Sequence, residues 1–172
     1  MPRSRGHTRA LPLLVYVYGG PGWQTIEDTF TVGWVDYLVT NLHIAVLKID
    51  ARGSGGRGWK YRSPVYGSLG YAEMQDQIEA TRLVLKKYHY LDPTRVAIHG
   101  WSYGGFATLR IVEMAPERMY KCAISGAPVT TFQYYGKLFL RNKNFSPKKW
   151  LYAEFENGVI SLDINMNPSK MT

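Results

Sequence analysis

Four short apolar runs, separated by long intervening segments, constrain the fold of this chain more than any other feature. The runs are residues 11–18, 43–50, 95–101 and 121–127. A two-residue turn is enough to join antiparallel strands, whereas parallel strands need a crossover of a dozen or more residues, usually a helix. The spacing therefore predicts parallel strands joined by crossover helices, which is an α/β arrangement.

Two of the intervening segments have helical character. Within residues 71–88, the side chains of one helical face recur at steps of four and three: Met74, Ile78, Thr81, Leu85 and Tyr88. Asp92 and Pro93 then predict a turn. A second helix is predicted for residues 106–115, which contain no glycine or proline and end at Pro116.

The composition is that of one globular domain, with 172 residues of which 45% are hydrophobic and 20% are charged. No apolar run approaches the roughly 20 residues of a membrane-spanning helix. Residues 1–10 form a basic arm that lacks the apolar run and cleavage site of a signal peptide. The single cysteine, Cys122, excludes an internal disulfide but leaves the redox compartment open.

The net charge of +8 does not predict a nucleic-acid-binding surface, because most of it lies at the two ends. Residues 1–10 carry +3 and residues 136–172 carry another +3, which leaves only +2 for the body. A nucleic-acid groove needs positive charge gathered on one folded face. Residues 136–172 show no sustained period, and we interpret them as a divergent, poorly specified tail.

Residues 100–104, with the sequence GWSYG, have the G-x-S-x-G spacing of a serine-hydrolase nucleophile. This motif needs a strand, a sharp turn that exposes the serine hydroxyl, and a helix that begins directly afterwards. Residues 96–98 supply the strand and residues 106–109 begin the helix, so Ser102 is the candidate nucleophile. The alternative is a plain strand-to-helix turn in which Ser102 only caps the helix.

This motif and four other blocks resemble the catalytic domain of the prolyl oligopeptidase family, most of all its dipeptidyl peptidase IV branch. The blocks follow the order and spacing of that family: VYGGPG at 17–22, DARGSG at 50–55, QDQIEA at 75–80, GWSYGGF at 100–106 and GAPVT at 126–130. The resemblance covers residues 11–135. It implies an incomplete α/β-hydrolase domain, a mainly parallel sheet with helices on both faces.

The resemblance also assigns roles to individual residues. Ser102 matches the nucleophile, and Tyr103 matches the residue whose backbone N–H binds the oxyanion and whose ring borders the substrate pocket. Tyr18 matches the tyrosine whose hydroxyl is the second oxyanion donor. Val129 and Tyr135 match apolar pocket residues, and Phe132 stands where the branch usually has a tryptophan; all three would line the pocket.

The resemblance further implies a partner, a location and a reaction. The complete parent would be a serine exopeptidase that releases dipeptides after proline or alanine through an acyl-enzyme on Ser102, and it would act on peptides, in a homodimer for some members. No cofactor or metal is implied. Cys122 matches a cysteine of the membrane-anchored members, which favours an extracellular parent.

No histidine follows Ser102, although the α/β-hydrolase triad runs in the order Ser, Asp or Glu, His. The four histidines are His7, His43, His89 and His99. His99 lies roughly 10 Å from Ser102 along an extended strand. His43 and His89 lie near the amino-terminal ends of strands, and only His7, on the arm, has the freedom to reach. We therefore expect a fragment that is inactive alone, because an unassisted serine is a poor nucleophile.

Three other interpretations compete with a peptidase fragment. Residues 53–58 fit G-x-G-x-x-G after a strand, but a dinucleotide site needs a helix that begins at once, and Trp59, Tyr61 and Pro64 make one unfavourable there. The VYGGPG block resembles the glycine-rich oxyanion loop of lipases and esterases. The third interpretation is a non-catalytic pseudoenzyme that binds a partner through an exposed sheet edge.

Overall fold

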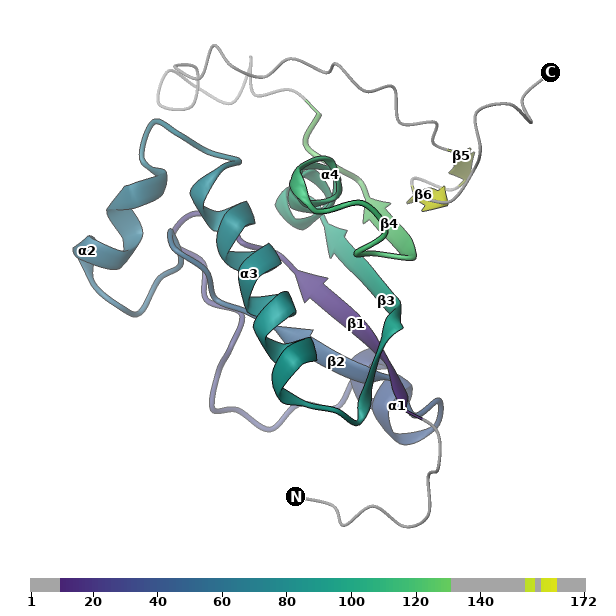
Figure 1. Ribbon diagram of the computed structural model, residues 1–172. Helices are drawn as coiled ribbons and strands as arrows, with labels where there is room; N and C mark the ends of the chain where they lie inside the picture. Colours follow the sequence, from purple (N-terminus) through teal and green to yellow (C-terminus); the bar gives the residue numbers. More distant parts are fainter. Residues whose placement is uncertain (1–9, 131–153, 157–158, 164–172) are drawn as a thin grey trace, which may run out of the picture.

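The computed structural model describes residues 10–130, 154–156 and 159–163, and six strands in these ranges form one sheet (Figure 1). Their spatial order is β2-β1-β3-β4-β6-β5. The first four pair in parallel, whereas β6 is antiparallel to both β4 and β5. The strand bounds are β1 Leu11–Val17, β2 Ala45–Lys48, β3 Leu91–Trp101, β4 Cys122–Gly126, β5 Glu154–Glu156 and β6 Val159–Asp163.

Helices lie on both faces of this sheet. The elements are α1 Trp34–Thr40, α2 Trp59–Arg62, the short 3₁₀ helix η1 Ser63–Val65, α3 Ala72–Lys87 and α4 Tyr103–Met114. Figure 1 shows α3 and α4 in front of the sheet. On the opposite face, Trp34 of α1 packs edge-on against Tyr16 and His99, with ring centroids 5.6 and 5.4 Å apart. The prediction of a mainly parallel sheet covered on both faces is confirmed.

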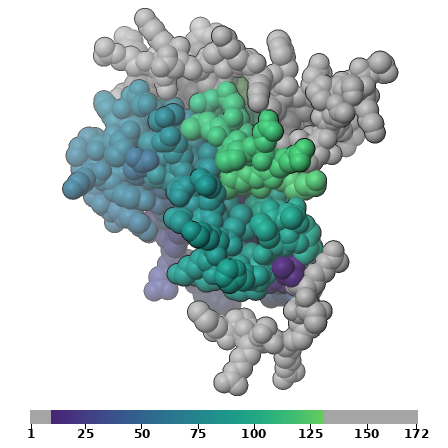
Figure 2. All heavy atoms as spheres, viewed as in Figure 1, coloured from purple at the N-terminus to yellow at the C-terminus, as the bar shows by residue number. Residues whose placement is uncertain are grey.

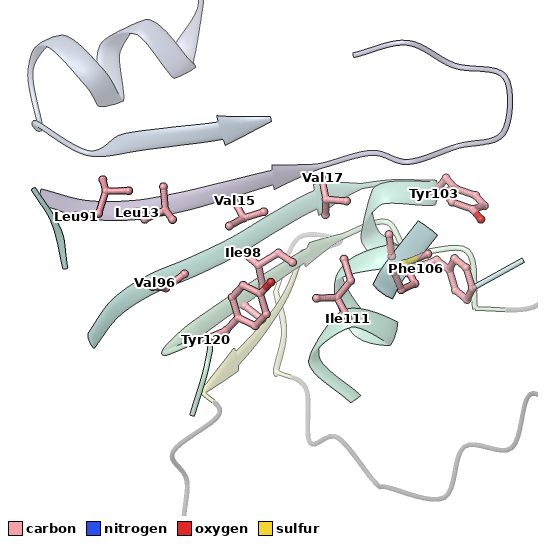
Figure 3. Close-up of a cluster of buried hydrophobic side chains, with 13 residues drawn as sticks. Leu13, Val15, Val17, Leu91, Val96, Ile98, Tyr103, Phe106, Ile111 and Tyr120 are labelled. Atoms are coloured by element: carbon pink, nitrogen blue, oxygen red, sulfur yellow. The ribbon is translucent and has the colours of Figure 1, made fainter. Parts of the chain in front are cut away.

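The core lies between the sheet and the helices α3 and α4. Side chains alternate between the two faces of a strand, so Val15 and Val17 of β1 face the same side as Ile98 of β3. Figure 3 shows these side chains pointing toward α4, where Ile111 is fully buried. Seen from the helical side, β1 is almost entirely hidden beneath later elements (Figure 2). Four of the seven residues of β1 are buried.

The predicted turn at Asp92 and Pro93 is present, but it forms a bulge within β3 and does not precede the strand. Leu91 pairs with Leu11, whereas the next aligned pair is Val96 with Leu13. The intervening residues bulge outward because the Asp92 carboxylate accepts hydrogen bonds from the N–H and hydroxyl groups of Thr94, at 2.9 and 2.6 Å. Such a short turn interrupts the pairing without ending the strand.

Two strands come from the segment interpreted above as a divergent tail. Residues 159–163 form β6, which pairs with β4 from Cys122↔Asp163 to Gly126↔Val159. Residues 154–156 form β5 at the outer edge of the sheet. Across the described residues, no helix is long and apolar enough to cross a membrane.

We expect acid to destabilise the fold through the bulge in β3. The Thr94 hydroxyl first, and then Arg95, holds the pKa of Asp92 at about 2, below its ordinary value of 3.8. A lowered pKa contributes stability that is present above the unfolded value and is lost as the pH falls toward about 2. Asp92→Asn should therefore lower the melting temperature at neutral pH, and the deficit should shrink as the pH falls through this window.

Thermal melts recorded across that pH range test this prediction. Glu79→Gln is the control, because Glu79 pairs with Arg82 at 3.4 Å on an exposed helix surface, where ion pairs contribute little. A deficit for Asp92→Asn that stays constant across the range would contradict the expectation.

Candidate active site

Ser102 lies in the sharp turn between β3 and α4, with backbone angles of φ 58° and ψ −116°. A non-glycine residue at positive φ is strained, and it persists only where its surroundings hold it. Here the Ser102 N–H donates to the Gly126 carbonyl at 2.9 Å, and the Ser102 carbonyl accepts from the Phe106 N–H at 3.1 Å. The turn therefore holds a half-buried Ser102 between β3 and α4, and its side chain makes no capping hydrogen bond to the helix.

Glycines allow the backbones around this turn to touch. A Cβ atom at Gly104 would lie 2.2 Å from the Val17 carbonyl oxygen, and one at Gly100 would lie 2.2 Å from the Gly104 oxygen. On the other side, a Cβ at Gly105 would lie 2.6 Å from the Gly126 oxygen. No side chain fits at these distances, so the start of α4 is wedged between β1 and β4.

Tyr103 is the first residue of α4, and its ring is buried next to the turn. Its N–H lies in the first helical turn, where helix geometry provides no acceptor within the helix. Its hydroxyl donates to the Glu73 carboxylate at 2.8 Å, and its ring packs on Phe106 at 5.3 Å (Figure 3). Burial first, and then the Glu73 charge, raises the pKa of Tyr103 well above its ordinary value. The phenol is thus a fixed neutral donor.

Tyr18 directly follows β1 and lies on the same side of the turn. Its ring centroid is 6.3 Å from that of Tyr103 and 5.6 Å from that of Trp23. A Cβ at Gly104 would lie 3.1 Å from the Tyr18 Cα, and one at Gly20 would lie 2.6 Å from the Tyr18 ring. Two glycines therefore make room for Tyr18. The fold thus places Tyr18 beside Tyr103, which directly follows Ser102.

The loop that carries Tyr18 is tied to the loop after β2. The Asp50 carboxylate accepts the N–H groups of Thr25 and Ile26 at 2.8 and 3.0 Å. Gly22 donates to the Gly53 carbonyl at 2.8 Å. The two loops at the carboxyl ends of β1 and β2 therefore form one hydrogen-bonded unit.

The glycine-rich residues 53–58 serve this loop contact and not a phosphate cradle. A Cβ at Gly55 would lie 2.5 Å from the Gly22 oxygen, so the space beside this glycine is filled by protein backbone. The prediction that no helix follows was wrong, since α2 begins at Trp59. However, α2 has only four residues, which is too short for the long helix of a dinucleotide site.

The predicted pocket residues are only partly within the described ranges. Val129 packs against the core, and its N–H donates to the Ser102 carbonyl at 3.4 Å. It therefore lies beside the nucleophile. Phe132 and Tyr135 lie outside the described residues.

The histidines within the described residues lie away from Ser102. His99 lies on β3, and its Nδ1 is 3.1 Å from the Ile124 carbonyl oxygen on the face covered by α1. His43 precedes β2 and His89 precedes β3, so both lie at the amino-terminal edge of the sheet. Ser102 lies at the opposite, carboxyl-terminal edge. His7 lies outside the described residues.

Glu73 is the residue that sequence reasoning missed at this site. Its side chain is only 1% exposed and reaches Tyr103 from the first turn of α3. In the sequence, Glu73 could have been noticed because it is a carboxylate directly before Met74, which belongs to the apolar face of the predicted helix. Within the described ranges, no group of three or more His, Cys, Asp or Glu side chains is placed to hold a metal ion.

Comparison with known proteins connects this geometry to peptidases. The sequence profile of the Prolyl oligopeptidase family matches residues 30–157. Dipeptidyl peptidase family member 1 of Caenorhabditis elegans is 53% identical over 133 residues, which is 77% of this chain and 17% of that protein. Venom dipeptidyl peptidase 4 of Apis mellifera is 40% identical over 81% of this chain and 18% of its own length.

A solved structure gives the same relationship. The crystal structure of Porphyromonas gingivalis dipeptidyl peptidase 4 aligns with a TM-score of 0.65 and 36% identity. The alignment covers 71% of this chain and 17% of that one. The chain thus spans about a sixth of the length of the relatives it matches, and its fold is part of an α/β-hydrolase domain.

We expect the contact between Gly104 and β1 to be indispensable to the fold. Gly104→Ala places a Cβ atom 2.2 Å from a backbone oxygen, which cannot move as a flexible side chain does. The loss in the free energy of unfolding should exceed about 3 kcal/mol. Gly33→Ala is the matched control, because nothing lies within 4 Å of its Cβ position and its φ is not in the left-handed region.

Chemical unfolding followed by circular dichroism measures both variants. Gly33→Ala should cost no more than about 1 kcal/mol, the usual scale for replacing a residue at a helix N-cap. Equal losses in the two variants would contradict the close packing described for the turn.

Proposed function

The chain belongs to the prolyl oligopeptidase family, and we propose that it carries the nucleophile and oxyanion-binding part of a dipeptidyl peptidase active site. The observation that supports this most directly is the strained Ser102 between β3 and α4, with Tyr103 and Tyr18 beside it. The relatives that match most of the chain carry dipeptidyl peptidase names. In a serine peptidase, these groups perform acyl transfer.

The proposed reaction begins when the Ser102 Oγ attacks the carbonyl carbon of the scissile peptide bond. The Ser102 proton passes to a general base, and the carbonyl oxygen becomes an oxyanion held by the Tyr103 N–H and the Tyr18 hydroxyl. The base gives this proton to the leaving nitrogen as the carbon–nitrogen bond breaks, so the amine departs and the acyl group stays on Ser102. Water then attacks the acyl carbon and gives a proton to the base, which passes it to the Ser102 oxygen as the carboxylic acid leaves.

The general base is the part of this reaction that the described residues do not supply. A base must lie within hydrogen-bonding reach of the serine, and the described histidines lie at the far edge or on the other face of the sheet. We therefore propose that this chain alone is inactive or nearly so. The complete active site would need a histidine and a carboxylate at the carboxyl-terminal edge.

The proposed substrates are peptides with a free amino terminus, cleaved after a penultimate proline or alanine. Val129 lies at the nucleophile, and we propose that Phe132 and Tyr135 complete an apolar pocket with the Tyr103 ring. The Tyr103 hydroxyl points to Glu73, so this residue would offer its ring edge and its N–H to the substrate. A homodimeric parent remains part of this proposal.

Exposed apolar side chains favour a second function, a non-catalytic chain that binds a partner. Phe30 is 95% exposed and Val32 is 77% exposed, and both directly precede α1. Sedimentation at rising protein concentration tests this alternative. A monomer at high concentration would count against it, because such exposed apolar surface favours association.

We expect a fluorophosphonate serine probe to leave the folded chain unlabelled. The probe reports a serine whose proton is removed by a base, and no described histidine is placed to do this. Ser102→Ala is the control for labelling elsewhere, with circular dichroism to verify the fold. Labelling that disappears in Ser102→Ala would show that a base reaches Ser102 and would overturn the proposed inactivity.

A thiol at position 102 should reveal the oxyanion-binding environment without any base. A thiolate at a helix N-terminus is stabilised, so its pKa falls below the ordinary value of about 8.5. In Ser102→Cys, the pH dependence of iodoacetamide alkylation should give a lowered thiol pKa. The unmutated chain measures the background from Cys122. An ordinary thiol pKa at position 102 would contradict the proposed oxyanion site.

A further inference from the structure

A buried carboxylate stands directly behind the oxyanion-binding residue. Glu73 is 1% exposed and lies in the first turn of α3. Its Oε1 accepts the Gly70 N–H at 2.6 Å and the Tyr103 hydroxyl at 2.8 Å, and its Oε2 accepts the Tyr71 N–H at 3.2 Å. Three donors from two parts of the chain therefore converge on one side chain.

This arrangement suits a carboxylate and no other side chain of similar size. An ionised carboxylate is only an acceptor, so all three contacts run in the favourable direction. An amide in the same place would turn an NH₂ group toward at least one of the donors. The start of a helix also favours a negative charge. The site thus selects for Glu at position 73.

The cations near Glu73 have other partners. Arg52 forms a bidentate pair with Asp76, with Nε and Nη2 at 2.7 to 3.0 Å from its oxygens. Arg110 pairs with Glu113 and reaches the Gly70 carbonyl at 3.4 Å. Tyr18 also lies on this side, with its ring centroid 6.3 Å from that of Tyr103. The Tyr103 hydroxyl is therefore the direct link between Glu73 and the nucleophile turn.

The Tyr103 ring adds side-chain contacts to the backbone contacts that hold its N–H in place. Ser102, one residue earlier, holds a strained φ of 58° that the surroundings must maintain. The ring is fixed at its tip by Glu73 and along its sides by Phe106 and Tyr18. Loss of the contact at the tip would let the ring move, and the adjoining N–H and Ser102 would move with it.

We propose that Glu73 is a positioning residue of the active site, which acts through the Tyr103 hydroxyl to hold the oxyanion-binding N–H and the Ser102 turn in place. This inference rests on the proposed function, since it assigns the support of that same site. Glu73 contacts no substrate in this proposal. It would act on the geometry at Ser102 through the hydrogen bond that links α3 to α4.

The test introduces Glu73→Gln into the Ser102→Cys chain and measures the thiol pKa by the pH dependence of alkylation. Removal of a nearby negative charge would by itself favour the thiolate and lower this pKa. Loss of positioning has the opposite sign, because a displaced Tyr103 N–H no longer stabilises the thiolate. We expect the thiol pKa to rise toward the ordinary value of about 8.5.

Asp76→Asn in the same background is the matched control. Asp76 lies one turn further along α3 and its ion pair with Arg52 supports the fold, but it does not touch Tyr103. It should lower the melting temperature and leave the thiol pKa unchanged. If Glu73 only stabilised the fold, Glu73→Gln would likewise lower the melting temperature and leave the thiol pKa unchanged.

Tyr103→Phe is the second variant, and it decides the question if Glu73→Gln does not fold. It removes only the hydroxyl and leaves the Gly70 and Tyr71 N–H groups on Glu73. We expect the thiol pKa to rise in the same direction as in Glu73→Gln. A thiol pKa that is low in Ser102→Cys and stays unchanged or falls in these variants would overturn the positioning role.

The two proposals fail in different ways. An ordinary thiol pKa in Ser102→Cys itself would contradict the oxyanion site before Glu73 is changed. A thiol pKa that is low in Ser102→Cys and does not change when Glu73→Gln or Tyr103→Phe is added would support the oxyanion site. It would exclude Glu73 from the positioning of that site.

Discussion

The backbone at the start of α4 lies so close to the Val17 carbonyl that only glycine fits at position 104. The rest of the site depends on this contact, because it joins the turn after β3 to the end of β1. Ser102 directly follows β3 and Tyr18 directly follows β1, and these two strands pair in parallel. Close backbone packing therefore brings Ser102 and Tyr18, the proposed nucleophile and oxyanion donor, to one edge of the sheet.

Two buried carboxylates support the residues that we propose to bind the oxyanion. Asp50 holds the loop beyond Tyr18, and Glu73 holds the Tyr103 ring. Both carboxylates are largely buried and accept more than one N–H group. Preorganised donors stabilise developing charge only when they do not have to reorganise. Asp50 and Glu73 would contribute to this preorganisation, because each holds the surroundings of one proposed donor in place.

The sequence predicts the parallel strands and the nucleophile turn because both depend on local patterns. Apolar runs mark the strands to within a few residues, and the G-x-S-x-G spacing identifies Ser102. Helix α1 is missed although Trp34, Tyr37 and Leu38 recur at helical spacing, because its seven residues are too few to establish a period. Glu73 is missed because its role arises from a contact with Tyr103, 30 residues away in sequence. Local patterns predict elements, whereas contacts of this kind appear only when the fold is known.

The two halves of the proposed chemistry are physically separable in this fold. The proposed nucleophile and oxyanion donors follow the carboxyl ends of β3 and β1, and packing within residues 10–130 fixes these residues there. The described histidines lie at the other edge or on the α1 face, so within these residues no histidine shares that edge with Ser102. In serine peptidases, oxyanion binding retains part of the rate enhancement when the triad is lost. In the proposed active site, the described residues would therefore supply charge stabilisation, and a group outside them would supply the base.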